Sequence, residues 1–81
     1  MVINVQFFAI LKEATGVDSC DLEIEDQHTV ADAMKKICKH FPQLDKYESV
    51  VSFAVNAEYA KPDVVLADGD ELALLPPISG G

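Results

Sequence analysis

The residues most suited to chemistry lie at the end of the chain, in the sequence LLPPISGG, which closes on Gly80 and Gly81. Glycine has no Cβ, so a glycine terminus could pass through a narrow channel and come close to the reacting atoms of another protein. An α-carboxyl group has an ordinary pKa of about 3.3–3.7, so at neutral pH it is an anion and a poor electrophile. Once activated, for example as a mixed anhydride with AMP, it could pass its acyl group to a sulfur or nitrogen nucleophile.

The rest of the chain offers little catalytic machinery. His28 and His40 are the two histidines, and we expect a loop position for the first and a helix-end position for the second, because neither belongs to a nucleophile–base arrangement. Cys20 and Cys38 have no metal-binding spacing, so we expect small buried hydrophobic residues and no disulfide. The acidic segment at residues 68–71 is far too short for an EF-hand loop and is predicted to form a turn. The sequence therefore predicts no metal site.

Length and charge restrict the class of protein. The chain has 81 residues, which predicts one domain, and a formal net charge of −8. That charge repels phosphate backbones, so nucleic acid is excluded as a partner. An acidic surface suits partners with basic docking surfaces, and it is explained equally well as a means of keeping a small domain soluble. The sequence shows no secretory leader and no apolar run of about 18 residues, so we expect a cytoplasmic protein that makes no contact with membranes.

Hydrophobic periodicity predicts four strands and one main helix. The helix begins after Thr29, a good N-cap with Asp32 in the first turn, and it ends before Pro42. A short helical turn is expected ahead of Gly16, and a turn at Asn56. The predicted strands cover residues 2–7, 19–25, 48–56 and 71–75. The apolar stripe of the helix comprises Val30, Ala33, Met34, Ile37, Cys38 and Phe41.

The order strand, strand, helix, strand, strand predicts an α+β roll, in which one main helix packs across a mixed sheet. The first and last strands of such a roll can lie side by side at its centre. Pro76 and Pro77 fix two successive φ angles and lack N–H donors, so the chain must leave the sheet there. We therefore divide the chain into a domain of residues 1–75 and an extended C-terminal tail of residues 76–81.

Four segments of the chain resemble a known family. The segments VQFFAILKEATG, FAVNAEYA, LADGDELALLPP and ISGG are similar to the small subunit of molybdopterin synthase, a ubiquitin-like sulfur carrier with the β-grasp fold. The most specific part is DGDELALLPPISGG, and the resemblance covers essentially the whole chain.

The resemblance implies a sulfur-donating subunit of a sulfurtransferase with no catalytic machinery of its own. An adenylating partner would use ATP to convert the Gly81 carboxylate to a glycyl adenylate, and sulfur from a persulfide would then replace AMP to leave a thiocarboxylate. The large synthase subunit would hold the pterin and receive the tail. Two sulfur transfers to cyclic pyranopterin monophosphate would build the dithiolene of molybdopterin. Two small and two large subunits would form a heterotetramer, and no cofactor would be bound permanently.

The resemblance also implies roles for individual residues. Gly81 would be the covalent carrier, and the tail that enters the partner's channel would comprise Pro76, Pro77, Ile78, Ser79 and Gly80. Leu74 and Leu75 are expected near the docking surface, where apolar anchors normally carry most of the affinity. The family often has arginine where this chain has Lys12, and aromatic residues near the two leucines. Lysine cannot make the planar bidentate contact of arginine, which puts a specific ion pair at that position in doubt.

Three other interpretations remain open from the residues. A sulfur carrier of the thiamine pathway shares the fold and the Gly-Gly end, although it is usually shorter and lacks this proline-containing ending. A ubiquitin-like modifier would join Gly81 to lysines of other proteins through isopeptide bonds. A β-grasp interaction module with an inert tail would be unaffected by a residue added after Gly81.

Overall fold

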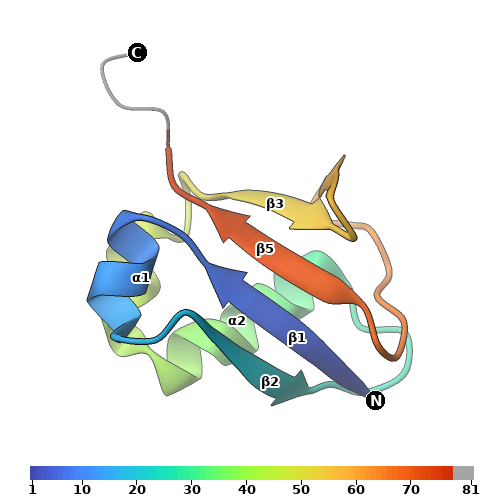
Figure 1. The fold of residues 1–81 in the computed structure, drawn as a ribbon. Coiled ribbons are helices and arrows are strands. Elements are labelled where there is room, and N and C mark those ends of the chain that lie inside the picture. Colours follow the sequence, from blue (N-terminus) through green and yellow to red (C-terminus); the bar gives the residue numbers. More distant parts are fainter. Residues whose placement is uncertain (78–81) are drawn as a thin grey trace.

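The computed structural model describes residues 1–77, which form a mixed five-stranded sheet with one main helix across one face (Figure 1). The strand order is β2-β1-β5-β3-β4. The strands are β1 (Val2–Phe7), β2 (Ser19–Glu23), β3 (Ser52–Val55), β4 (Glu58–Ala60) and β5 (Glu71–Leu75). The helices are α1 (Ile10–Thr15), α2 (Val30–His40) and the 3₁₀ helix η1 (Pro42–Tyr47). This arrangement confirms the predicted α+β roll. None of the helices within these residues is both long and apolar enough to span a bilayer.

The first and last strands lie side by side at the centre of the sheet, as predicted. β1 pairs with β5 in parallel, with Val5 opposite Leu72 and Phe7 opposite Leu74. β5 also pairs with β3 in antiparallel orientation, so it is hydrogen-bonded on both sides. Because successive side chains of a strand point to opposite faces, Val5, Phe7, Leu72 and Leu74 all face α2, and each is at most 2% exposed. The strand that precedes the tail is therefore firmly anchored.

The N-terminus of α2 carries a reciprocal capping arrangement. The Thr29 hydroxyl accepts a hydrogen bond from the Asp32 N–H at 3.2 Å, and the Asp32 carboxylate accepts one from the Thr29 N–H at 3.0 Å. Two backbone N–H groups that have no partner within the helix ladder are satisfied in this way. The predicted N-cap is confirmed. The hydrogen bond from the Thr29 N–H holds the pKa of Asp32 below its ordinary value of 3.8.

Asp32→Asn is expected to lower the free energy of unfolding at neutral pH and to have no effect in strong acid. The folded-state pKa of Asp32 is lowered, so its contribution is fully present above the ordinary pKa and is lost as the pH falls through the folded value. Urea titrations of both proteins at neutral pH and at about pH 2 measure the difference. A difference that stays constant over this range would contradict the assignment of the stabilisation to the ionised carboxylate.

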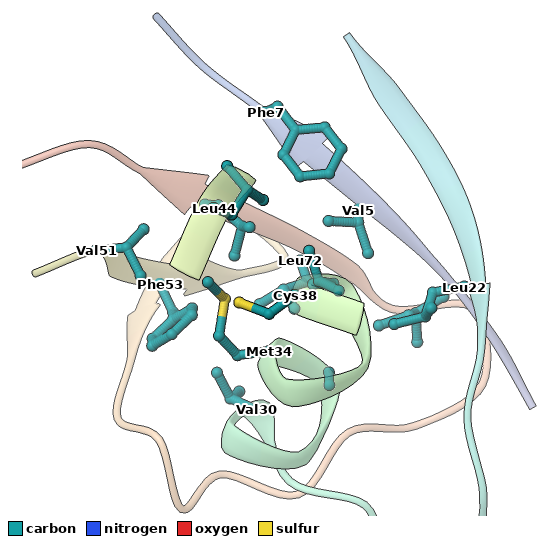
Figure 2. Close-up of a cluster of buried hydrophobic side chains, with 14 of the residues drawn as sticks. Val5, Phe7, Leu22, Val30, Met34, Cys38, Leu44, Val51, Phe53 and Leu72 are labelled. Carbon is teal, nitrogen blue, oxygen red and sulfur yellow. The ribbon is translucent and has the colours of Figure 1, made fainter. Parts of the chain in front are cut away.

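The core lies between α2 and the inner face of the sheet. Figure 2 shows Met34 and Cys38 of α2 among Leu72, Phe53 and Leu44, which come from β5, β3 and η1. The predicted stripe of α2 is confirmed, since Val30, Ala33, Met34, Ile37 and Cys38 are all buried. The last stripe residue, Phe41, is half-buried and packs edge-on against Phe7, with ring centroids 5.4 Å apart.

Two elements were absent from the sequence-based prediction, β4 and η1. β4 has three residues and lies at the edge of the sheet, too short for an alternating pattern to be recognised. Residues 48–51 were expected to be strand, but the chain turns there, and the Val50 and Val51 N–H groups both donate to the Tyr47 carbonyl. The turn between β3 and β4 is as predicted, with positive φ at Asn56 and Ala57.

Candidate functional site

The candidate site surrounds the point where the chain leaves the sheet. β1 and β5 are parallel, so their carboxyl ends meet at the same edge, and the residues after Phe7 lie beside the residues after Leu74. β5 ends at Leu75, and Pro76 and Pro77 cannot donate to a ladder. Pro76 is half-buried and Pro77 is exposed. The tail therefore starts from a fixed position next to α1.

An apolar hollow of 360 Å³ lies against the two prolines. It is lined by Ala9, Ile10, Tyr47, Pro76 and Pro77, which come from three distant parts of the chain. Ile10 is 43% exposed although its neighbour Leu11 is 1% exposed, because α1 buries only one side of its first turn. We call Ile10, Tyr47, Pro76 and Pro77 the tail-base surface. It offers apolar area in a concave shape where another protein could dock.

Ala9 connects β1 to α1 through a strained backbone conformation. Its φ of 51° and ψ of −123° lie in a region that favours glycine. Such a conformation in a residue with a side chain costs on the order of 1–3 kcal/mol and persists only where the surrounding structure imposes it. The sharp reversal at Ala9 brings α1 back against the start of the tail, so this strain helps to build the hollow.

A second hollow, of 420 Å³, is lined in part by Phe8, which is 42% exposed. An ion pair forms part of its wall, with 2.6 Å between Lys12 Nζ and Asp18 Oδ1. The hydrogen bond to Asp18 raises the pKa of Lys12 above its ordinary value of 10.5. Both side chains are more than half exposed, so the pair contributes little to stability. Lys12 therefore has a partner within its own chain, at the position where the resembling family often has arginine.

The structure corrects one expectation about the docking surface. Leu74 was predicted to lie near it, but Leu74 is 0% exposed and belongs to the core, opposite Phe7 of β1 and Phe53 of β3. It cannot touch a partner while the sheet is intact. Leu75 points to the opposite face and is half-buried. Ile78, Ser79, Gly80 and Gly81, which the sequence assigned to the tail and its reactive end, lie outside the described residues.

Sequence reasoning missed two residues of the tail-base surface, Ile10 and Tyr47, and it also missed the exposed Phe8 of the second hollow. A signal for Phe8 was present, since a strand that buries Ile3, Val5 and Phe7 must turn the next residue outward. No comparable signal existed for Tyr47, which reaches the hollow through η1.

The remaining reactive side chains have structural roles. His28 lies in the loop before α2, where its Nδ1 accepts a hydrogen bond from the Glu25 N–H at 3.3 Å. Both cysteines are free, as expected, and burial raises the pKa of Cys38 to about 11, so its thiol stays protonated at neutral pH. Cys20 is half-buried rather than buried, and burial raises the pKa of its thiol as well. Neither thiol is activated as a nucleophile.

The acidic segment forms a turn at residues 68–70, as predicted, and Glu71 begins β5. Asp68 accepts a hydrogen bond from the Val2 N–H at 2.8 Å, and Asp70 accepts one from the Ala67 N–H at 2.8 Å. A further bond joins the Asn56 side chain to Asp70 at 3.0 Å. The carboxylates thus fasten the start of β5 to neighbouring strands. No cluster of three or more potential metal ligands occurs within residues 1–77.

The fold and the position of the tail define the class of protein. A mixed sheet with the first and last strands at its centre and a helix across one face is the β-grasp fold of ubiquitin-like proteins. The small archaeal modifier protein 1 of Haloferax volcanii has this fold, with 29% sequence identity and a TM-score of 0.85 over 95% of this chain and 98% of that chain. A ubiquitin of Caldiarchaeum subterraneum, 21% identical, shares the fold with a TM-score of 0.67 over 100% of this chain and 98% of that chain.

Within this class the chain belongs to the ThiS family, whose model matches residues 5–81. The molybdopterin synthase sulfur carrier subunit of Chlamydomonas reinhardtii is 39% identical over 83 residues, with 100% of each chain covered. A solved complex of subunits 1 and 2 of the molybdopterin-converting factor from Helicobacter pylori contains a chain of the same fold. That chain is 24% identical, with a TM-score of 0.69 and 100% of each chain covered.

Proposed function

We propose that this chain is the sulfur carrier subunit of a molybdopterin synthase and that the carboxyl group of Gly81 carries the sulfur. The observation that supports this most strongly is the 39% identity over the full length of a molybdopterin synthase sulfur carrier subunit. The family match also extends to residue 81, so it includes the proposed carrier residue.

The proposed reaction has three stages, each carried out with another protein. A carboxylate oxygen of Gly81 first attacks the α-phosphorus of ATP in an adenylating partner, giving a glycyl adenylate and releasing pyrophosphate. A persulfide sulfur of the sulfur donor then attacks the acyl carbon and AMP leaves, which gives an acyl disulfide. A thiol of the donor attacks the donor's own sulfur in that S–S bond, so that the thiocarboxylate is released and a disulfide remains on the donor. Finally the tail delivers this sulfur to cyclic pyranopterin monophosphate in the large synthase subunit, and two transfers complete the dithiolene. In this proposal the partners bind ATP and the pterin, and the chain itself binds no permanent cofactor.

The contribution of this chain is to present one atom at a defined distance from a rigid body. β5 is held on both sides by β1 and β3, so the position of Leu75 is fixed. Residues 76–81 can span at most about 20 Å when fully extended. Residues Ile78, Ser79 and Gly80 would occupy the partner's channel, and the two prolines would restrict the directions in which the tail can leave. Such restriction reduces the entropy lost when the tail is inserted.

The tail-base surface is the proposed docking surface for the large subunit. Ile10→Asp is expected to weaken binding to a large synthase subunit by about 2 kcal/mol, roughly 30-fold in Kd, because it places a charge among apolar anchors. Ile10 is 43% exposed, so the Tm should change little. Calorimetric titration of the two purified subunits measures the Kd.

Val65→Asp is the matched control for that prediction. Val65 is 53% exposed and pairs with Thr29 at the N-terminal end of α2. Tyr47 of the tail-base surface belongs to η1, which follows the C-terminal end of α2. The control should bind as tightly as the unmodified chain. Equal losses of affinity in both variants would show that the added charge, and not the tail-base surface, is responsible.

An intact-mass measurement tests the carrier function directly. The chain is incubated with ATP, an adenylating enzyme of the molybdopterin pathway and a sulfur source, and the expected product has one oxygen replaced by sulfur in its C-terminal peptide. The thiocarboxylate form is then supplied to a large synthase subunit together with cyclic pyranopterin monophosphate. Failure to form molybdopterin from the sulfur-loaded chain would contradict the pathway assignment.

A second candidate function is that of a protein modifier. It is favoured by the likeness to the small archaeal modifier protein 1, at 29% identity. The same incubation separates the two functions when a lysate depleted of small molecules is added. Isopeptide-linked conjugates of Gly81 would support a modifier, whereas sulfur incorporation without conjugates supports a carrier.

A further inference from the structure

The β2 edge of the sheet is open. β2 pairs with β1 on one side, and the sheet of the described chain has no strand beyond it. In an antiparallel pair, residues alternate between those whose backbone groups bond to the neighbour and those whose groups point away from it. The Phe7 N–H donates to the Asp18 carbonyl, and the Ile24 N–H donates to the Met1 carbonyl. The even-numbered residues between Asp18 and Ile24 therefore direct their backbone N–H and C=O groups toward β1.

The backbone groups of Ser19, Asp21 and Glu23 consequently point to the open edge. One acceptor among them is occupied, because Lys36 Nζ donates to the Glu23 carbonyl at 2.5 Å. This contact confirms the direction in which the odd-numbered residues point. The groups of Ser19 and Asp21 remain directed outward, and they form a short template to which an extended segment could add as a sixth strand.

A hollow with a mostly apolar lining follows this edge on the helix side. It measures 270 Å³ and is lined by Cys20, Asp21, Leu22, Ile37, His40 and Phe41. Leu22 and Ile37 form its floor, being 4% and 1% exposed, and Phe41 is half-buried. A strand added beside β2 would point every second side chain toward this hollow. Aliphatic side chains suit such a lining.

The other face of the same edge is acidic. Asp21 and Glu23 are both exposed, and they lie on the open face of the sheet, opposite α2. The side chains of an added strand that point to this face would lie beside the two carboxylates. Opposite charges directly across neighbouring strands are favourable, and like charges are unfavourable. The edge therefore selects lysine or arginine at alternate positions.

A second copy of this chain does not satisfy that requirement. Antiparallel pairing of two β2 edges about Asp21 would place the two Asp21 carboxylates opposite one another. The acids thus protect the edge from self-association, and they leave it open to a strand of the opposite charge. The net charge of −8 favours a basic partner by long-range attraction as well.

We propose that the β2 edge is a second docking site, which takes an extended segment of another protein in which aliphatic residues alternate with lysine or arginine. The segment adds to β2 through the backbone of Ser19 and Asp21 and places its aliphatic side chains in the hollow between β2 and α2. β1 separates β2 from β5, so this site is distinct from the tail and the tail-base surface. A partner bound here leaves Gly81 available to the proteins that act on it.

Two capped peptides, one alternating valine with lysine and one alternating valine with glutamate, test the proposal on the full-length chain. Amide chemical shifts report the site. The lysine peptide is expected to shift the amides of residues 19–23 and to slow hydrogen exchange at Asp21. The glutamate peptide should bind at least roughly tenfold more weakly, since its charges face two carboxylates. The lysine peptide with alternate N-methyl groups should lose binding, because it cannot form the added ladder.

Charge variants make the test specific to this edge. The double substitution Asp21→Lys/Glu23→Lys should reverse the preference between the two peptides. Glu58→Lys/Asp63→Lys makes the same change in net charge on exposed residues of β4 and its following loop, and it should keep the preference for the lysine peptide. Equal behaviour of the two double variants, shifts confined to other surfaces, or no binding of the lysine peptide would overturn the proposal.

The outcome is independent of the proposed sulfur-carrier function. A chain that lacks Gly81 should bind the lysine peptide with unchanged affinity while it fails in sulfur loading. Loss of peptide binding in that variant would contradict a site on β2, whereas loss of sulfur loading alone leaves the site intact.

Discussion

Removal of Gly81, or addition of one residue after it, is expected to abolish sulfur transfer while the domain stays folded. Either change moves the terminal acyl carbon by the length of one residue, about 3.3–3.6 Å. Misplacement of a reacting group by 1 Å can already cost about 100-fold in rate. We therefore expect a loss of at least about 100-fold in thiocarboxylate formation, measured by intact mass with the adenylating partner.

The same two variants should keep the Tm and the far-ultraviolet circular dichroism of the unmodified chain, because Gly81 lies six residues beyond the end of β5. A conservative change elsewhere on the surface, Glu58→Gln on the edge strand β4, should retain full sulfur transfer. Full activity of the Gly81 deletion would refute the proposal that this carboxyl group carries the sulfur.

Met34→Asp is expected to have the opposite effect and to unfold the domain. Met34 is 3% exposed and lies at the centre of the core between α2 and the sheet (Figure 2). The substitution removes a buried side chain, which costs about 2–5 kcal/mol, and it places a carboxylate without a partner in an apolar environment. A domain of this length is stable by about 4–12 kcal/mol at 0.05–0.15 kcal/mol per residue. The combined penalty is of the same size as the whole stability.

Two control variants isolate the effect of burial. Met34→Leu keeps the volume and apolar character of the site, and it should cost less than about 1.5 kcal/mol. Lys35→Asp introduces the same carboxylate at the next residue, which is exposed, and it should leave the domain folded. Loss of amide dispersion in nuclear magnetic resonance spectra of Met34→Asp alone is the expected result. A cooperative transition of normal Tm in that variant would contradict the core described here.

Local signals in the sequence were sufficient for most of the fold. The Thr29 cap, the α2 stripe and the turn at residues 68–70 all depend on residues within a few positions of each other, and each was predicted correctly. β4 was not predicted, because three edge residues carry too little pattern. The positions of the first and last strands followed from their order along the chain.

The candidate site was harder to predict, because adjacent apolar residues differ in burial and point to opposite faces of the sheet. Leu74 is buried and Leu75 is half-buried, and a shift of one residue in register would exchange their faces. Phe7 at the end of β1 and the next residue, Phe8, differ in the same way, since the first is buried and the second is exposed. The tail-base surface also combines residues near positions 10, 47 and 76, whose proximity depends on the parallel pairing of β1 with β5. No local pattern carries that information.

The position of β5 between β1 and β3 means that the sheet cannot close until β5 has been synthesised. A nascent chain emerges from its N-terminus, so β1 must wait for the last strand before the middle of the sheet can close. A chain that stops before residue 71 lacks β5 at the centre of the sheet. It also lacks Pro76, so it cannot form the apolar hollow. Ribosomal products that are too short to bear a reactive end would therefore also be unable to engage the enzymes that would otherwise load them.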